Sequence, residues 1–95
     1  APREIDEALL RHPAVLEAAV VGFPDERWGE APHAFVVFRG GCEAAPADLR
    51  AFCREHLAHF KVPHSFSPVT ELPKTATGKI QKFVLRKGRP NLAAQ

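Results

Sequence analysis

Two apolar runs rich in β-branched residues constrain the fold of this chain most strongly. They extend over residues 15–21 (VLEAAVV) and 34–38 (AFVVF), and glycine or proline follows closely after each. Short runs of this kind, bounded by turn residues, are typical of buried strands. We therefore expect two strands there, joined by a loop over residues 23–30. A third strand is expected over residues 65–72, at an edge of the sheet, because Pro68 has no N–H to donate to a neighbouring strand.

Helical patterns surround these strands. Residues 2–11 have apolar positions at helical spacing, and the pattern ends before Pro13. A second helix is expected from Pro46, with Cys53 on its apolar stripe and therefore in the core. A third, short helix is expected over residues 80–87. The order helix–strand–strand–helix–strand–helix predicts an α+β fold, a small three-stranded sheet covered by helices.

The length of 95 residues corresponds to one compact domain, too short for a complete enzyme with pockets for two substrates. No apolar run is long enough to span a membrane, and the N-terminus lacks the pattern of a secretory signal peptide. We therefore expect a cytoplasmic protein with reduced cysteines.

A metal site is not expected. The two cysteines, Cys42 and Cys53, form no CxxC pair. The spacing of His56, His59 and His64 matches no closed zinc pattern.

The charges of the chain are divided unevenly. Residues 72–95 carry six Lys and Arg residues and no Asp or Glu, so this segment has a formal charge of +6. The whole chain carries +2, and the other residues together therefore carry −4. Such a segment favours a polyanionic partner such as a nucleotide or CoA, or it is a solvated basic tail. Nucleic acid is not expected, because Phe83 is the one aromatic residue among the basic ones.

The polar loop over residues 73–79 ends in Gly78 and Lys79, just before the last expected helix. Glycine lets the backbone approach a ligand closely, a helix start offers free N–H groups, and the lysine ammonium adds a mobile charge. The loop is therefore suited to an anion. It is not a phosphate-binding P-loop, because that motif needs glycine where Pro73 stands and Ser or Thr where Ile80 stands.

Residues 72–82, LPKTATGKIQK, closely resemble the closing motif of the adenylate-forming enzymes, the superfamily of acyl-CoA synthetases, luciferases and peptide-synthetase adenylation domains. The resemblance covers essentially the whole chain. It implies that residues 1–90 are the C-terminal lid domain of an AMP-binding acyl-CoA synthetase. Residues 91–95, at the end of the chain, are expected to be a disordered tail. Further segments resemble the same family in the same order, namely residues 2–6 with Leu9, and residues 12–15, 18–22, 24–25, 28–30, 34–37 and 60–63.

By this resemblance, Lys79 is the catalytic lysine of adenylation, in which a carboxylic acid and ATP give an acyl-adenylate and pyrophosphate. Thr77 and Gly78 belong to the same nucleotide and substrate loop. The simpler interpretation of Lys79 is a solvated lysine in a basic tail.

The resemblance also implies a second step, in which the lid rotates and CoA attacks the adenylate. Trp28 and Gly29 lie in the stretch that resembles the CoA-side loop, and Arg54 on the second helix could reach a CoA phosphate. The simpler interpretations are a loop tryptophan that covers the sheet edge and a solvent-facing arginine.

ATP and CoA are thus the implied substrates, with a fatty or other apolar acid, and Mg²⁺ arrives with ATP. The expected partner is a large N-terminal adenylation domain outside this chain, without which the lid is inactive. Acetylation of Lys79 by a lysine acetyltransferase is expected to switch the enzyme off. Two alternatives remain: a ligase that loads a carrier protein instead of CoA, and a non-catalytic module that binds a nucleotide, CoA or an acidic partner through residues 72–95.

Overall fold

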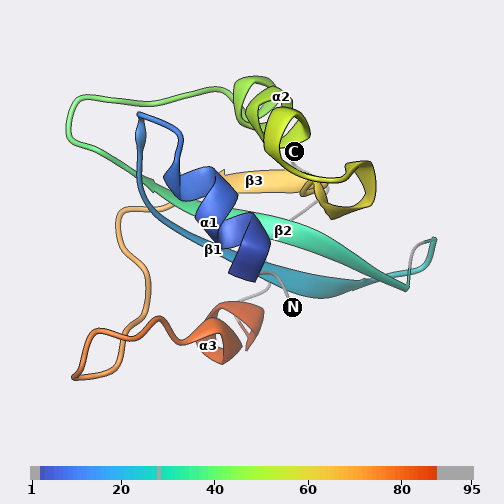
Figure 1. Ribbon diagram of the computed structural model, residues 1–95. Helices are drawn as coiled ribbons and strands as arrows, with labels where there is room; N and C mark the ends of the chain where they lie inside the picture. Colours follow the sequence, from blue (N-terminus) through green and yellow to red (C-terminus); the bar gives the residue numbers. More distant parts are fainter. Residues whose placement is uncertain (1–2, 28, 88–95) are drawn as a thin grey trace.

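The computed structural model describes residues 3–27 and 29–87. The helices and strands follow the expected order, with a short 3-10 helix added after the second α-helix. The predicted tail over residues 91–95 lies outside the described residues. The elements are α1 (Arg3–Leu10), β1 (Val15–Asp25), β2 (Gly29–Phe38), α2 (Pro46–His56), the 3-10 helix η1 (His59–Lys61), β3 (Ser65–Pro68) and α3 (Lys82–Lys87), as Figure 1 shows.

The three strands form one mixed sheet in the order β1-β2-β3. β1 and β2 pair antiparallel, from Val15 opposite Phe38 to Asp25 opposite Gly29. β3 pairs parallel to β2, and α2 lies in the connection between them. The expected α+β architecture is therefore confirmed. So is the edge position of the third strand, of which Pro68 is the last residue.

The expected loop over residues 23–30 is wrong, because most of it is strand. β1 continues to Asp25 and β2 already begins at Gly29. The reason is that Phe23 and Ala31 pair across the two strands and are both buried, so the buried pattern continues beyond the first apolar runs. Only residues 26–28 connect the two strands.

Two other boundaries also differ from the expectation. β3 ends at Pro68 instead of residue 72, because the chain then leaves the sheet edge and buries Leu72 in the core on one face of the sheet. α3 begins at Lys82 instead of residue 80, because Ile80 forms a β-bridge with Lys74.

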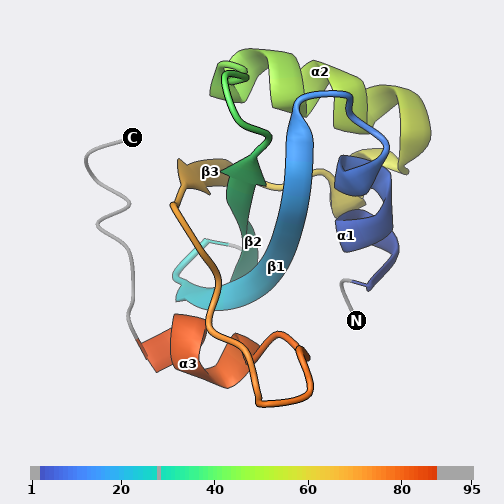
Figure 2. The same cartoon turned by 90° about the vertical axis from the view of Figure 1, so that its left-hand side faces the viewer.

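Each face of the sheet has its own apolar core. α1 and α2 cover one face, where Leu9 and Leu49 pack with Phe66 of β3. α3 and the segment before it lie on the other face, where Leu85 packs against a cluster that includes Phe35. Figures 1 and 2 show these two layers on opposite sides of the sheet.

Cys53 is fully buried in the first core, as its place on the apolar stripe of α2 predicts. Burial disfavours the thiolate and raises the pKa of the Cys53 thiol to about 11. The side chain is therefore an unreactive apolar residue, whereas Cys42 is exposed.

His33 is a buried polar residue that the sequence patterns did not single out. Its Nδ1 lies 2.5 Å from Ser65 Oγ and its Nε2 lies 2.7 Å from Ser67 Oγ, so the imidazole joins β2 to β3. Phe23 and Phe35 pack against the ring edge-on. Burial lowers the pKa of His33 to about 4, and the ring is therefore neutral at pH 7.

Candidate functional site

The segment that carries Lys79 is a short β-hairpin rather than an open loop. At its base the N–H of Gln81 donates to the carbonyl of Pro73 at 2.9 Å. One step closer to the tip, Lys74 and Ile80 form an antiparallel bridge. The lysine is thus held by a backbone ladder on both sides of the turn.

The tip of this hairpin is a turn from Thr75 to Gly78. The N–H of Gly78 donates to the carbonyl of Thr75 at 2.9 Å, and the N–H of Thr75 donates to the carbonyl of Lys79 at 2.8 Å. Gly78 has a φ of 89°, in the left-handed region that glycine adopts without steric cost. Lys79 is the first residue after the turn and is exposed. Thr77, Gly78 and Lys79, which are consecutive in the sequence, therefore lie at the exposed tip of this hairpin.

Three ion pairs fasten the hairpin and α3 to the rest of the domain. Each joins a basic residue of the segment 73–87 to an acidic residue of α1, β1 or β2. Asp6 also accepts a hydrogen bond at 2.7 Å from the N–H of Val20 in β1, so it connects three elements. The pairs are Lys74 with Glu17 at 2.5 Å, Lys82 with Asp6 at 2.7 Å and Arg86 with Glu30 at 2.8 Å.

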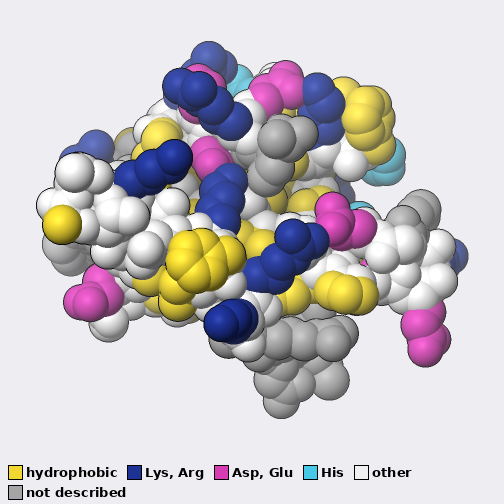
Figure 3. All heavy atoms as spheres, turned by 90° about the horizontal axis from the view of Figure 1, so that it is seen from below, with side chains coloured by type: hydrophobic (Ala, Val, Ile, Leu, Met, Phe, Trp, Pro, Cys, Tyr) yellow, Lys and Arg dark blue, Asp and Glu magenta, His cyan; other side chains and the backbone are white. Residues whose placement is uncertain are grey.

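These pairs change the interpretation of the basic segment. Three of its six cations are neutralised inside the domain. Seen from the α3 side, Lys and Arg side chains alternate with acidic and apolar ones (Figure 3). The ammonium of Lys79, by contrast, makes no ion pair or hydrogen bond within the described part of the chain. Lys79 is therefore a cation at a hairpin tip that is available to an external anion.

The residues expected on the CoA side lie elsewhere in the domain. Gly29 is the first residue of β2, and Trp28 lies outside the described residues. Arg54 is exposed on α2 and lines a pocket of about 350 Å³. Arg50 and His59 line the same pocket, whose described lining contains no carboxylate. This surface is suited to an anionic group.

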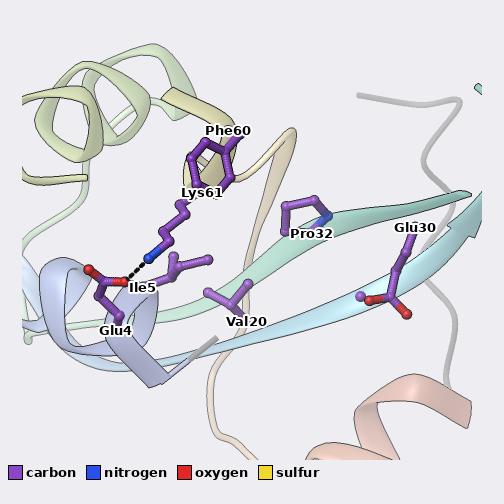
Figure 4. Close-up of a pocket in the computed structure, with 8 residues that line it drawn as sticks. Glu4, Ile5, Val20, Glu30, Pro32, Phe60 and Lys61 are labelled. Atoms are coloured by element: carbon purple, nitrogen blue, oxygen red, sulfur yellow. Dashed lines mark hydrogen bonds and ion pairs between the residues drawn. The ribbon is translucent and has the colours of Figure 1, made fainter. Parts of the chain in front are cut away.

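A second pocket, of about 390 Å³, has Glu30 of β2 in its lining (Figure 4). Ile5, Val20 and Pro32 form part of its lining, and Phe60 stands on its rim with 77% of its surface exposed. Glu30 lies across it, over Gly22, where an added Cβ would come within 2.3 Å of the Glu30 carboxyl carbon. An ion pair between Glu4 and Lys61 forms a further wall.

The expected site residues thus occupy separate surfaces. The hairpin with Lys79 and the β1–β2 turn before Gly29 lie at opposite ends of the domain (Figure 1). Arg54 is on α2, on the face of the sheet opposite to α3 (Figures 1 and 2). Lys79 and Arg54 therefore cannot contact the same small chemical group unless the domain changes its orientation toward that group.

Two features are absent from the described residues. Across residues 3–27 and 29–87, no group of three or more His, Cys, Asp or Glu side chains is arranged to hold a metal ion. In the same part of the chain, no helix has the length and apolar character needed to cross a membrane.

Comparison with known proteins identifies the family. Residues 4–79 match the family described as the AMP-binding enzyme C-terminal domain. The chain belongs to this family. This AMP-binding enzyme C-terminal domain also superposes on part of an acyl-CoA synthetase from Brucella canis, with a TM-score of 0.87 and 44% sequence identity over 92% of the chain and 17% of that structure.

Two curated relatives of this AMP-binding enzyme C-terminal domain are CoA ligases. It is 53% identical to a probable CoA ligase of Humulus lupulus, named CCL11, over 87% of the chain and 15% of that protein. It is 51% identical to a sulfoacetate–CoA ligase of Cupriavidus necator, over 90% of the chain and 17% of that protein. The chain therefore spans about a sixth of the length of these relatives.

Sequence reasoning located the hairpin tip but missed the residues that hold it. Thr75 was not singled out, although a threonine at the start of a turn is a known turn signal. Glu17 and Asp6 were also missed, because their partners are far away along the chain and no local pattern connects them.

Proposed function

We propose that this AMP-binding enzyme C-terminal domain is the mobile lid of an ATP-dependent carboxylic acid–CoA ligase and that Lys79 is its catalytic residue. The observation that carries the proposal is the state of Lys79, an exposed ammonium at a hydrogen-bonded hairpin tip with no carboxylate partner among the described residues. The kinship with CoA ligases supplies the class of reaction, and a larger part of the enzyme would hold ATP, Mg²⁺ and the acid.

The first reaction places two anions against each other. A carboxylate oxygen of the acid attacks the α-phosphorus of ATP, the P–O bond to the β-phosphate breaks, and pyrophosphate leaves. An ammonium beside the reacting oxygens lowers their repulsion and stabilises the charge that develops in the transition state. Losing one such donor typically lowers the rate by about a hundredfold to a thousandfold.

In the second reaction the thiolate of CoA attacks the acyl carbon of the adenylate and AMP leaves. We assign Gly29, Trp28 and Arg54 to CoA binding. The pocket that Arg50 and Arg54 line supports this assignment, because an anionic CoA phosphate would meet cations there. Since Arg54 and Lys79 lie on different faces of the sheet, the proposal requires the domain to turn between the two steps.

The test uses the full-length enzyme with ATP, CoA and a panel of acids that includes 2-methylpropanoate, trans-cinnamate and octanoate. For the acid that reacts fastest, Lys79→Ala should slow adenylation by about a hundredfold to a thousandfold. It should leave the transfer to CoA from supplied acyl-adenylate nearly unchanged. Lys87→Ala, which removes an exposed lysine of α3, is the matched control and should affect neither step.

Arg54→Ala provides the reverse comparison in the same assays. Loss of a phosphate contact should raise the KM for CoA and leave adenylation at its normal rate. If Lys79→Ala lowered the rates of both half-reactions equally, the role of Lys79 in adenylation would be wrong. If Arg54→Ala left the KM for CoA unchanged, the assignment of the CoA surface would be wrong.

A further inference from the structure

Thr75 makes two hydrogen bonds to Lys79 in the hairpin. Its backbone N–H donates to the carbonyl of Lys79 at 2.8 Å. Its side-chain oxygen, Oγ1, accepts the N–H of Lys79 at 3.1 Å. Both backbone polar groups of Lys79 are therefore bonded to the same residue.

The hydroxyl of Thr75 also lies 2.9 Å from the hydroxyl of Thr77. Because Oγ1 accepts from Lys79, it can still exchange a second hydrogen bond with Thr77. The Thr75 hydroxyl thus bonds both to the residue before Gly78 and to the residue after it. Thr75 is half-buried, whereas Thr77 and Lys79 are exposed.

These bonds determine the direction in which Lys79 leaves the backbone. With its N–H and its carbonyl both held, the residue has little freedom to rotate, and its Cα–Cβ bond points along a fixed line from the tip. The left-handed Gly78 alone would close the turn without holding the N–H of Lys79. The threonine hydroxyl is therefore the part of the hairpin that restricts the lysine itself.

We infer that Thr75 is a positioning residue for adenylation, acting through Lys79 without contacting substrate. This inference rests on the proposed function of Lys79. It adds a physical reason for a hydroxyl at this position: an ammonium on a long, flexible side chain is useful in a transition state only if its backbone anchor does not move. A misplacement of about 1 Å in a catalytic group can cost on the order of a hundredfold in rate.

The test compares Thr75→Val with Thr75→Ser in the full-length enzyme. Valine keeps the shape and the β-branch but removes the hydroxyl, whereas serine keeps the hydroxyl. Thr75→Val should lower the kcat of adenylation roughly tenfold to a hundredfold with little change in KM. Thr75→Ser should keep most of the wild-type rate of adenylation. Transfer to CoA from supplied acyl-adenylate should be normal in both variants. Thr70→Val is the matched control, because Thr70 is an exposed threonine outside the hairpin, and it should behave as the wild type.

A double variant separates positioning from a general loss of structure. If Thr75 acts through Lys79, adding Thr75→Val to Lys79→Ala should slow adenylation no further than Lys79→Ala alone. The melting temperature of Thr75→Val should stay close to that of the wild type, because the groups that it releases are exposed to water.

Three outcomes would overturn this inference. Wild-type adenylation by Thr75→Val would show that the hydroxyl is dispensable. Additive losses in the double variant would show that Thr75 acts independently of Lys79. If Thr75→Ser adenylated as slowly as Thr75→Val, loss of the hydroxyl would be excluded as the cause of the slower adenylation. A normal rate in Lys79→Ala, by contrast, would overturn the proposed function itself, so the two failures are distinguishable.

Discussion

At the scale of the residue, His33 shows how burial controls the charge of a single side chain. The imidazole is 1% exposed and lies between Ser65 and Ser67 of the neighbouring strand. Its pKa falls from 6.5 to about 4, because the charged form would lose its hydration. In the unfolded chain the same group would titrate near its ordinary value.

The stability of the domain should therefore depend on pH through His33. Between pH 6.5 and 4 the unfolded chain binds a proton that the folded domain does not, so the free energy of unfolding should fall as the pH falls. The loss at the acid end should reach about 3 kcal/mol. Urea unfolding of the domain at several pH values measures this change in the free energy of unfolding. His33→Val should flatten this part of the profile, while His59→Gln, at an exposed histidine, should not. An unchanged slope in His33→Val would contradict this account.

The residue scale is also where prediction from sequence was least complete. The motif around Gly78 and Lys79 is local, and its resemblance to the family was enough to locate the tip of the hairpin. His33 gave no signal, because Ser65 and Ser67 are 32 and 34 residues away along the chain. Contacts of this kind become visible only when the strand register is known.

At the scale of the element, the apolar patterns predicted the existence and order of the helices and strands but not their ends. The extension of β1 and β2 through residues 23–30 depends on the pairing of Phe23 with Ala31, which isolated runs do not reveal. The late start of α3 depends on the bridge between Lys74 and Ile80. Tertiary pairing, rather than local propensity, decides these boundaries.

Asp6 is the residue that holds α1, β1 and α3 together, and its loss should loosen all three. Its side chain is 17% exposed, bonds the N–H of Val20 and pairs with Lys82. Asp6→Ala should lower the free energy of unfolding by about 1.5 to 3 kcal/mol, since both bonds involve a charged group. Asp6→Asn keeps an acceptor for Val20 and should lose less.

Chemical denaturation of the domain measures both variants. Glu7→Gln is the control, because Glu7 makes only an exposed ion pair with Arg3 within the described residues. This substitution should change the stability by less than about 0.5 kcal/mol. Equal stability of Asp6→Ala and Glu7→Gln would show that the connection through Asp6 contributes nothing.

At the scale of the whole molecule, the domain presents different chemistry on its two sides. Three ion pairs fasten the hairpin of Lys79 and α3 to α1, β1 and β2, and the basic pocket of Arg54 lies on the face of the sheet opposite to α3. These contacts hold the hairpin, α3 and the sheet together as one body. In the proposed mechanism, a turn of that body would replace one surface with the other at a site on the larger part of the enzyme.

The most direct measurement of the central claim restores the ammonium of Lys79 chemically. In a full-length enzyme that carries Cys42→Ser to remove the exposed thiol, Lys79→Cys should adenylate about a hundredfold to a thousandfold more slowly than the parent. Alkylation with 2-bromoethylamine joins the sulfur to an aminoethyl group as bromide leaves, and it replaces the ammonium at nearly its original distance. The adenylation rate should then largely recover, while Lys79→Ala treated in the same way should not. A modified Lys79→Cys enzyme, verified by mass, that remained as slow as before would contradict the account.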